Sequence, residues 1–232
     1  MRTPTVVEEI RDLYRKRAKH YDITANLYYL VGFRIQAYRK KAVAALRLRP
    51  GDTVVDIGCG TGLNFAFLQR AVGPHGKIIG VDITDAMLEK ARNRVRKNGW
   101  TNVELIQQDA ATFVFPQRVD GMLATFALSL MPGLDRVIRN GAAALAPGKR
   151  MVILDLKLPS NWMRVLAPFL VWITRPFGVT RELADARPWE TIWTTMSRCS
   201  LTVTVDELYF GCAYIAIGER TGVTHDHSAR PG

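Results

Sequence analysis

The sequence predicts an α/β domain built around a mostly parallel sheet. Short apolar runs alternate with helical patterns from residue 53 onward, and such alternation predicts parallel strands joined by crossover helices. Near the carboxyl end, two further apolar runs are separated only by a short turn, so we expect them to pair antiparallel. A composition of 48% hydrophobic and 23% charged residues over 232 positions indicates a packed core rather than a disordered chain.

Seven strands are expected in all. Five of them are expected at residues 53–57, 77–82, 103–107, 120–125 and 150–156, and the last two form a hairpin at residues 200–209 and 213–217. The helices between the first five strands are expected at residues 63–72, 85–98 and 134–146. Thr84 is placed to cap the second of these helices, and Gly99 is placed to end it.

Three parts are expected along the chain. Residues 1–50 form a helical cover, because apolar side chains between Val6 and Tyr14 recur at helical spacing. Residues 51–220 form the main domain, with an insertion at residues 159–198 that holds four of the five tryptophans. This insertion is interpreted either as a helix buried on the sheet or as a lid that touches lipid. Residues 221–232 lack apolar periodicity and are expected to be a loose tail.

Several classes of protein are excluded by the composition. The apolar stretch at residues 165–174 falls far short of the roughly 20 residues that cross a bilayer. Charged side chains between Arg2 and Asp12 leave no apolar core for a secretory signal, so we expect a cytosolic protein. The three cysteines are widely scattered, so neither a disulfide framework nor a zinc cluster is expected.

The chain is strongly basic, with a net charge of +11. The first 50 residues carry twelve basic and four acidic side chains, so they supply +8 of this charge. This segment is interpreted either as a solvated helical face or as a patch for anionic lipid or nucleic acid. If the segment is a patch for anionic lipid, we expect peripheral contact with the inner face of a membrane.

A glycine-rich turn follows the first strand, in the sequence Asp56-Ile57-Gly58-Cys59-Gly60-Thr61-Gly62. Glycine at alternate positions between a strand and a helix allows the backbone to come close to a ligand. A dinucleotide fingerprint requires Gly or Ala at position 63, where this chain has Leu63. The carboxylate of Asp56 also suits a ligand with a cationic end better than a pyrophosphate.

Carboxylates also end the next two expected strands. Asp82 lies 20 residues beyond Gly62, at a position where a carboxylate can accept both hydroxyls of a ribose. The third strand is followed by Gln108-Asp109-Ala110. The carboxyl ends of parallel strands form the ligand-binding edge of open α/β sheets, so these carboxylates are expected to lie at one site.

At residues 21–218 the sequence resembles the class I S-adenosylmethionine-dependent methyltransferases. The resemblance implies a Rossmann-like sheet of seven strands whose last strand inserts beside the fifth, with S-adenosylmethionine as cofactor. It further implies the residues that contact this cofactor, which are Asp56, Gly58, Cys59, Gly60, Gly62, Asp82, Ile83, Met87, Asp109, Ala110 and Thr125. Among these, Asp82 would bind the ribose, and Ile83 and Met87 would pack against the adenine.

The acceptor of the methyl group is less closely defined. Only four histidines occur, with no compact ligand cluster, so no metal is expected. Methyltransferases that modify nucleic-acid amines carry an Asp/Asn-Pro-Pro-aromatic loop after the fourth strand, whereas residues 125–132 here are mainly apolar. Nucleic acid is therefore disfavoured, although an inactive cofactor-binding protein that acts as an RNA-binding or scaffold subunit stays open.

A lipid-type acceptor is favoured by the apolar segment at residues 126–131, the Trp-rich insertion and the basic amino-terminal segment. The run around Tyr21 and residues 154–157 resemble bacterial phosphatidylethanolamine N-methyltransferases and betaine-lipid enzymes. We therefore expect N-methylation of a phospholipid headgroup amine. The alternative is C- or O-methylation of a quinone or another small apolar acceptor, although residues 126–131 depart from the Gly-Leu-Arg-Asn loop of quinone C-methylating relatives.

Three residues are candidates for catalysis. Tyr14 and Tyr21 could hold a developing ammonium by cation–π attraction, which is worth on the order of 0.5 to 2 kcal/mol for each ring. His20 could accept a proton, because an unperturbed imidazole titrates near 6.5. Arg175 and Arg187 of the insertion are candidate donors to a headgroup phosphate. The oligomeric state is left open.

Overall fold

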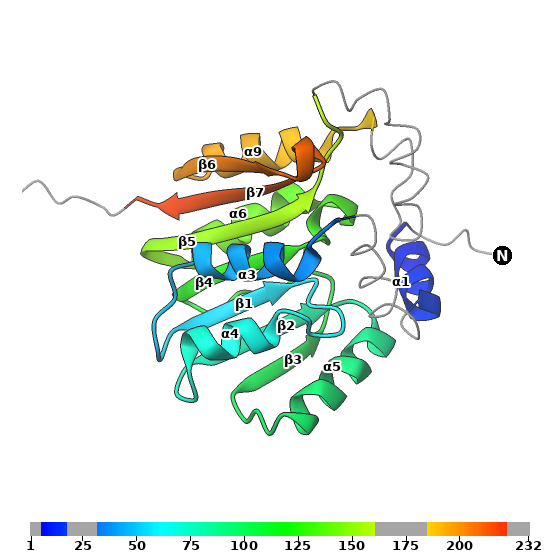
Figure 1. Cartoon of the computed structure of the whole chain (residues 1–232), viewed down its shortest axis with the longest axis vertical. Helices are drawn as coiled ribbons and strands as arrows, with labels where there is room; N and C mark the ends of the chain where they lie inside the picture. Colours follow the sequence, from blue (N-terminus) through cyan, green and yellow to red (C-terminus); the bar gives the residue numbers. More distant parts are fainter. Residues whose placement is uncertain (1–5, 18–31, 161–184, 222–232) are drawn as a thin grey trace, which may run out of the picture.

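The computed structural model describes residues 6–17, 32–160 and 185–221. Seven strands form one sheet in the order β3-β2-β1-β4-β5-β7-β6 (Figure 1). Their bounds are β1 Thr53–Ile57, β2 Lys77–Asp82, β3 Val103–Gln107, β4 Val119–Thr125, β5 Leu145–Leu156, β6 Leu201–Leu208 and β7 Ala213–Arg220. Strands β1 to β5 run parallel, and β7 runs antiparallel to both β5 and β6. The predicted fold class and the insertion of the last strand beside the fifth are confirmed.

Helices cover both faces of the sheet (Figure 1). One face carries α3 (Ile35–Ala45), α4 (Phe65–Val72) and α5 (Asp85–Lys97), whose buried side chains share a core with Val54 of β1. The other face carries α6 (Leu134–Ala144) and α9 (Pro188–Arg198), which pack on Met122 of β4. Strands covered on both faces need apolar side chains in both directions, and β4 is buried along nearly its whole length.

The sheet contains a switch point that places the site. From β1 the chain moves outward to β2 and β3, and then returns to β4 on the other side of β1. Crossover helices at such a point diverge to opposite faces, and open α/β sheets bind ligands at the carboxyl ends of these strands. Helix α1 (Val6–Arg17) lies near this edge, where Arg15 forms a salt bridge of 3.0 Å with Asp85 at the start of α5 (Figure 1).

The predicted bounds of β1, β2 and β3 agree with the structure, while other elements differ at their ends. Helix α6 ends at Ala144 rather than at residue 146, and β5 begins already at Leu145 rather than at residue 150. Pro147 explains this change, because the residue before a proline is pushed into extended backbone. Residues 146–149 bulge from the ladder, since Val119 pairs with Leu145 and Gly121 with Arg150. The first turn after the glycines is not helical either, so α4 begins at Phe65.

Several expectations fall partly outside the described residues. Of the predicted helical cover, α1 and α3 are described and residues 18–31 are not. Most of the insertion, including Trp162 and Trp172, lies outside the described residues, as do residues 222–232. Among the helices that are described, none is long and apolar enough to cross a bilayer. The proposed boundaries of the three parts stay predictions.

Candidate active site

A cavity lies at the carboxyl ends of β1, β2 and β4. Eight of the residues proposed from the sequence line it: Tyr14, Gly58, Gly60, Asp82, Ile83, Met87, Asp109 and Ala110. They come from α1, from the turn after β1, from the end of β2 and the start of α5, and from the segment after β3. The sheet therefore assembles in one place residues that are as far apart as 14 and 110.

The turn after β1 leaves open space above its backbone. Gly60 has φ +55°, and a Cβ atom built at this position would meet no protein atom within 4 Å. Gly58 is required for another reason, because its Cβ would lie 2.5 Å from Cβ of Ala127 and 2.8 Å from Cε of Met131. The glycine at 60 thus exposes backbone to the cavity, while the glycine at 58 allows the loop after β4 to approach.

Asp82 connects this turn to β2. Its Oδ2 accepts a hydrogen bond of 2.9 Å from the Gly60 N–H, and its Oδ1 accepts one of 2.8 Å from the Thr84 N–H. Burial raises the pKa of this carboxyl above its ordinary value, while the backbone donors oppose the shift. Each carboxylate oxygen keeps a second lone pair. The geometry therefore fits the ribose of a nucleoside, whose two hydroxyls need two acceptors.

The side of the cavity next to β3 has the character of a nucleobase slot. Met87 is 1% exposed and lines the cavity together with Ile83 and Ala110. Asp109 accepts a hydrogen bond of 2.9 Å from the Ala111 N–H through Oδ1, which holds the segment after β3 in a tight turn. Apolar surface beside a carboxylate suits an adenine ring and its exocyclic amine, so these residues fit the cofactor that the sequence suggested.

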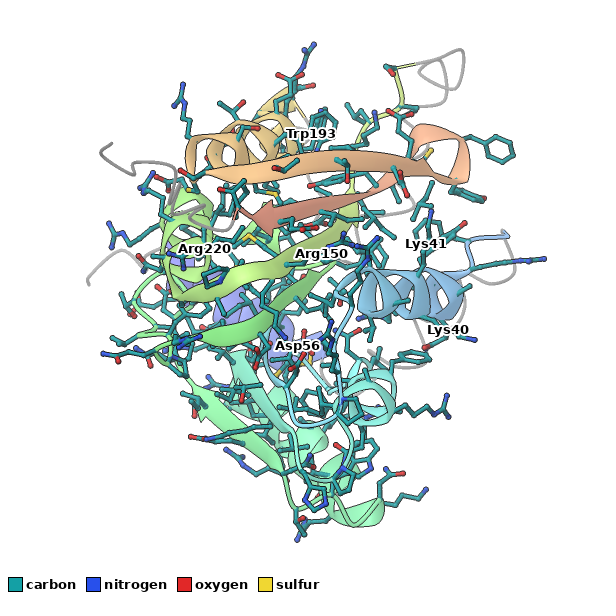
Figure 2. All side chains as sticks on the ribbon, turned by 90° about the vertical axis from the view of Figure 1, so that its left-hand side faces the viewer. Lys40, Lys41, Asp56, Arg150, Trp193 and Arg220 are labelled. Carbon is teal, nitrogen blue, oxygen red and sulfur yellow. The ribbon has the colours of Figure 1, made fainter. Side chains whose placement is uncertain are left out.

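Four other proposed cofactor residues do not line this cavity: Asp56, Cys59, Gly62 and Thr125. Asp56 is fully buried within the sheet, as Figure 2 shows, and its two oxygens accept hydrogen bonds of 3.0 and 3.1 Å from Nδ2 of Asn64. A Cβ on Gly62 would overlap the ring of Phe65, so this glycine serves packing. In the structure the contacts of Asp56 are therefore those to Asn64, and its contact with a cationic ligand stays a prediction.

A buried polar network surrounds Asp56. Asn64 Nδ2 also donates to Oγ1 of Thr125 at 2.9 Å, and Nη1 of Arg39 donates to Asn64 Oδ1 at 2.9 Å and to Thr125 Oγ1 at 2.5 Å. Burial raises the pKa of Asp56 to about 7, against the opposing effects of Asn64 and Arg39. The network joins β1, α4, β4 and α3 at the switch point. It therefore holds together the strands and helices beneath the cavity.

Sequence reasoning missed Arg39 and Asn64. A signal for Arg39 exists, because it lies on the face of α3 that also carries Ile35, Ala42 and Val43, all of them buried. A cation on an apolar helix face needs buried partners. Asn64 offers no comparable signal, since an asparagine just before a helix is ordinarily a cap, and no side-chain cap hydrogen bond forms here.

The wall opposite the nucleobase slot is apolar. It is formed by Phe126, Ala127, Leu130, Met131 and Pro132, which follow β4 and include η2 (Leu128–Leu130). Phe126 has φ +55°, which is a strained conformation for a bulky residue. Its ring lies 5.2 Å from Cζ of Arg39, so a cation–π contact helps to hold the side chain at the cavity.

A second buried cluster supports this wall from behind. Asp155 of β5 is 4% exposed, and its Oδ2 accepts a hydrogen bond of 2.9 Å from the Ser129 N–H of η2. Burial raises the pKa of this carboxyl. Tyr214 of β7 lies opposite Asp155 in the register, with its ring 5.4 Å from that of Trp193 in α9. In the part of the chain that the structure describes, Tyr214 Oη and Trp193 Nε1 have no hydrogen-bond partner.

The proposed catalytic residues have different outcomes. Tyr14 lines the cavity from α1, whereas Tyr21, His20 and Arg175 lie outside the described residues. Arg187 is exposed just before α9, where it pairs with Glu190 at 3.2 Å and does not line the cavity. Over the described ranges, no group of three or more His, Cys, Asp or Glu is arranged to hold a metal ion.

Comparisons with known proteins agree with this geometry. The family described as "Methyltransferase domain" matches residues 48–185. The chain is 27% identical to the demethylmenaquinone methyltransferase of Listeria welshimeri over 76% of its own length and 75% of the relative. It is 32% identical to the enzyme of the same name from Symbiobacterium thermophilum over 71% and 66% of the two chains.

Among solved structures, the chain resembles magnesium protoporphyrin IX methyltransferase from Synechocystis with bound SAM, with a TM-score of 0.66 and 16% identity over 95% and 100% of the two chains. This likeness shows the fold. The family match covers all five parallel strands, the glycine turn, Asp82 and Asp109. The chain therefore belongs to the methyltransferase domain family and is a class I S-adenosylmethionine-dependent methyltransferase.

Proposed function

We propose that the enzyme methylates a ring carbon of a reduced quinone. The observation that carries this proposal is the set of curated relatives named demethylmenaquinone methyltransferase, which align over about three quarters of the chain. The apolar wall formed by Phe126, Leu130 and Met131 supports it, since a flat apolar ring packs well against such side chains. O-methylation of the same ring is the other outcome of this chemistry.

None of these findings supports the phospholipid headgroup that the sequence led us to expect. A headgroup phosphate needs cationic donors close to the reacting amine. Among the described residues that line the cavity, two are carboxylates and none is Lys or Arg. The quinone alternative is therefore better supported than N-methylation of a phospholipid.

The reaction places clear demands on the chain's own residues. When bound, S-adenosylmethionine supplies a methyl group on a cationic sulfur. A bond forms between the ring carbon and this methyl carbon while the carbon–sulfur bond breaks, and the sulfur keeps the electron pair. The ring loses one proton, so that a hydroquinone enters and a methylated hydroquinone leaves. The enzyme accelerates this step mainly by holding both reactants close and in line.

Two groups of described residues would position the reactants, one group for the cofactor and the other for the acceptor ring. Asp82, Asp109 and Met87 would hold the nucleoside half of the cofactor, and the backbone at Gly60 would let the rest of the cofactor approach the turn. Phe126 and Met131 line the apolar side of the cavity, where a flat ring would pack, and would keep water away from the reacting carbon. Exclusion of water strengthens the electrostatic interactions that develop in the site.

The test uses the purified protein, methyl-labelled S-adenosylmethionine and one acceptor at a time. The acceptors are a prenylated naphthohydroquinone that carries deuterium at the free ring carbon, and vesicles of phosphatidylethanolamine. We expect label on the naphthohydroquinone with loss of the deuterium, as C-methylation requires. Label with the deuterium retained would show O-methylation, and label on the phospholipid amine would overturn the proposal. Cofactor binding without transfer to either acceptor would also contradict it.

A further inference from the structure

The turn between β6 and β7 exposes an aromatic side chain. It lies at the end of the sheet where the cavity is, which is the carboxyl end of the parallel strands. Phe210 of η5 (Tyr209–Gly211) is 65% exposed. Leu208 and Ala213, on either side of the turn, are in register with Leu156 at the carboxyl end of β5. The turn is therefore at the same end of the sheet as the cavity.

The backbone of this turn is strained. Tyr209 has φ +48° and Phe210 has φ +56°, both in the left-handed region. This conformation is unfavourable for bulky residues, and such strain persists where the surrounding structure imposes it, often at functional sites. Among the described residues, the other large hydrophobic side chain with high exposure is Val114, at 82%. Val114 shares a surface depression with Ala146 and Arg220, at the opposite end of the sheet.

A chain of aromatic rings runs from this exposed turn to the cavity. The ring centroids of Phe210 and Tyr209 are 5.6 Å apart, and those of Tyr209 and Phe33 are 5.1 Å apart. Phe33 in turn lies 6.0 Å from Phe126, which lines the cavity. Packed aromatic side chains thus connect the exposed turn with Phe126 at the cavity.

Basic side chains lie beside the same turn. Residues 32–51 contain no acidic residue, and Arg34, Lys40 and Lys41, at the start of α3 and along it, are exposed, whereas Arg47 and Arg49 lie beyond α3 towards the amino end of β1. Figure 2 shows Lys40 and Lys41 on α3, with Lys41 on the side of the helix that faces the β6–β7 hairpin. Lys41 forms a salt bridge of 3.1 Å with Asp206 of β6, which places α3 directly beside the hairpin. Over the described ranges, Arg34 and Lys40 form no ion pair.

We propose that the Tyr209–Gly211 turn and the exposed face of α3 form a docking surface for a bilayer that contains anionic phospholipid. An aromatic ring at the headgroup level and basic side chains beside it are the two features that hold proteins at such a surface. Docking would place the end of the sheet that holds the cavity at the membrane, so that an acceptor with an apolar tail stays at the bilayer as it approaches the cavity. This route for the acceptor rests on the proposed function, whereas the docking itself does not.

The proposed docking surface uses one part of the basic amino-terminal segment, α3, together with the turn between β6 and β7. The sequence suggested residues 1–50 as a basic patch for anionic lipid or nucleic acid, and both α1 and α3 belong to that segment. In α1, Arg15 already pairs with Asp85 and with Asp12, so part of its charge is balanced within the protein. The surface at α3 combines charge with an exposed ring, and this combination is what recognition of an anionic bilayer requires.

The test is co-sedimentation of the full chain with vesicles, without any methyl acceptor. Vesicles of phosphatidylcholine alone are compared with vesicles that contain phosphatidylglycerol. We expect binding to the anionic vesicles that weakens with salt. Phe210→Ala should weaken it about tenfold or more, because burial of a Phe side chain is lost. The double substitution Arg34→Gln and Lys40→Gln should weaken it about fivefold for each charge removed. Phe210→Trp should retain it.

Two matched variants control for general effects of exposure and charge. Val114→Ala removes an exposed apolar side chain at the opposite end of the sheet, and Lys97→Gln removes one exposed charge at the end of α5. Both should bind as the wild type does. Equal weakening by the controls, equal binding to neutral vesicles, or no binding by the wild type would each overturn the proposal.

A protein partner for the same surface gives a different result. If Phe210→Ala dissociates a lipid-free oligomer in size-exclusion chromatography while vesicles are not bound, the turn is an interface between copies of the chain and the proposal is wrong. Because no acceptor is present, the assay is independent of the quinone chemistry. Vesicle binding without quinone methylation would contradict the proposed function and leave the docking surface in place.

Discussion

Substitution of Gly60 by Ala separates the role of this residue in the fold from its role in binding the cofactor. The residue has φ +55°, and an added Cβ would meet no protein atom within 4 Å. The folded protein can therefore accommodate the methyl group. Replacing glycine by alanine in the left-handed region costs roughly 1–2 kcal/mol of conformational free energy. The space that the methyl group fills is the space that we assign to the cofactor.

The size of the binding effect follows from this geometry. An extra methyl group in a closely packed contact costs typically 1–3 kcal/mol, which corresponds to affinity that is weaker by about 5- to 150-fold. Isothermal titration with S-adenosylhomocysteine measures this change directly. Urea unfolding of the same samples measures the conformational cost on its own.

Gly99 provides the matched control. It has φ +66°, and a Cβ at this position also meets nothing within 4 Å, but it lies between α5 and β3 and does not line the cavity. Gly99→Ala should lose a similar amount of stability and keep the affinity of the wild type. If Gly60→Ala binds S-adenosylhomocysteine as tightly as Gly99→Ala does, the cofactor does not lie over this turn.

Three further changes test the rest of the site. Asp82→Ala should weaken cofactor binding by roughly 1.5–3 kcal/mol, measured by titration, because two hydroxyl acceptors are lost. Arg39→Met should lower the free energy of unfolding in urea by about 2–4 kcal/mol, since Asn64 and Thr125 lose a buried donor. The pKa of Asp56 is raised from 3.8 to about 7, so the folded protein binds a proton that the unfolded chain has released between these values. Its stabilising contribution is therefore present at low pH and is lost as the pH rises towards 7, which lowers the free energy of unfolding by about 4 kcal/mol in all. Asp56→Asn should reduce this pH dependence of the free energy of unfolding, measured in urea.

Each of these expectations has an outcome that contradicts it. Unaltered affinity in Asp82→Ala would remove the ribose assignment, and an unchanged urea midpoint in Arg39→Met would show that the network does not stabilise the fold. For Asp56→Asn, stability is compared with the wild type at pH 5 and pH 7.5. Equal changes in stability between these pH values for the two proteins would show that Asp56 is already ionised at the lower pH.

Much of the fold could be predicted because its signals are local. The bounds of β1, β2 and β3 follow from short apolar runs that end at Asp56-Ile57, Asp82 and Gln107, and a strand of five or six residues is set by its own pattern and its flanking turns. The hairpin of β6 and β7 follows from the shortness of its connection. The ends of α6 and β5 were predicted less well, since a proline at 147 acts on the residue before it and the bulge depends on pairing with β4.

The candidate site was predicted where the topology alone brings residues together. Gly60, Asp82 and Asp109 follow three neighbouring strands, and parallel strands deliver their carboxyl ends to one edge of the sheet. The neighbours of Asp56, Asn64 and Arg39, could not be predicted from the motif that contains it. No local pattern connects residues 39, 56 and 64, which come together only when α3 and α4 pack on the sheet.

By itself, the sequence determined the order of strands and helices along the chain, the glycine turn, and the carboxylates at the carboxyl ends of the parallel strands. These features depend on backbone propensity and on residues close together in the chain. Only the tertiary structure decided which polar side chains are buried as a network, which of them line the cavity, and that Phe210, Tyr209 and Phe33 form a packed row of rings that reaches Phe126. Such contacts join residues that are distant along the chain. They are set by the packing of whole elements, which side-chain patterns within one element do not contain.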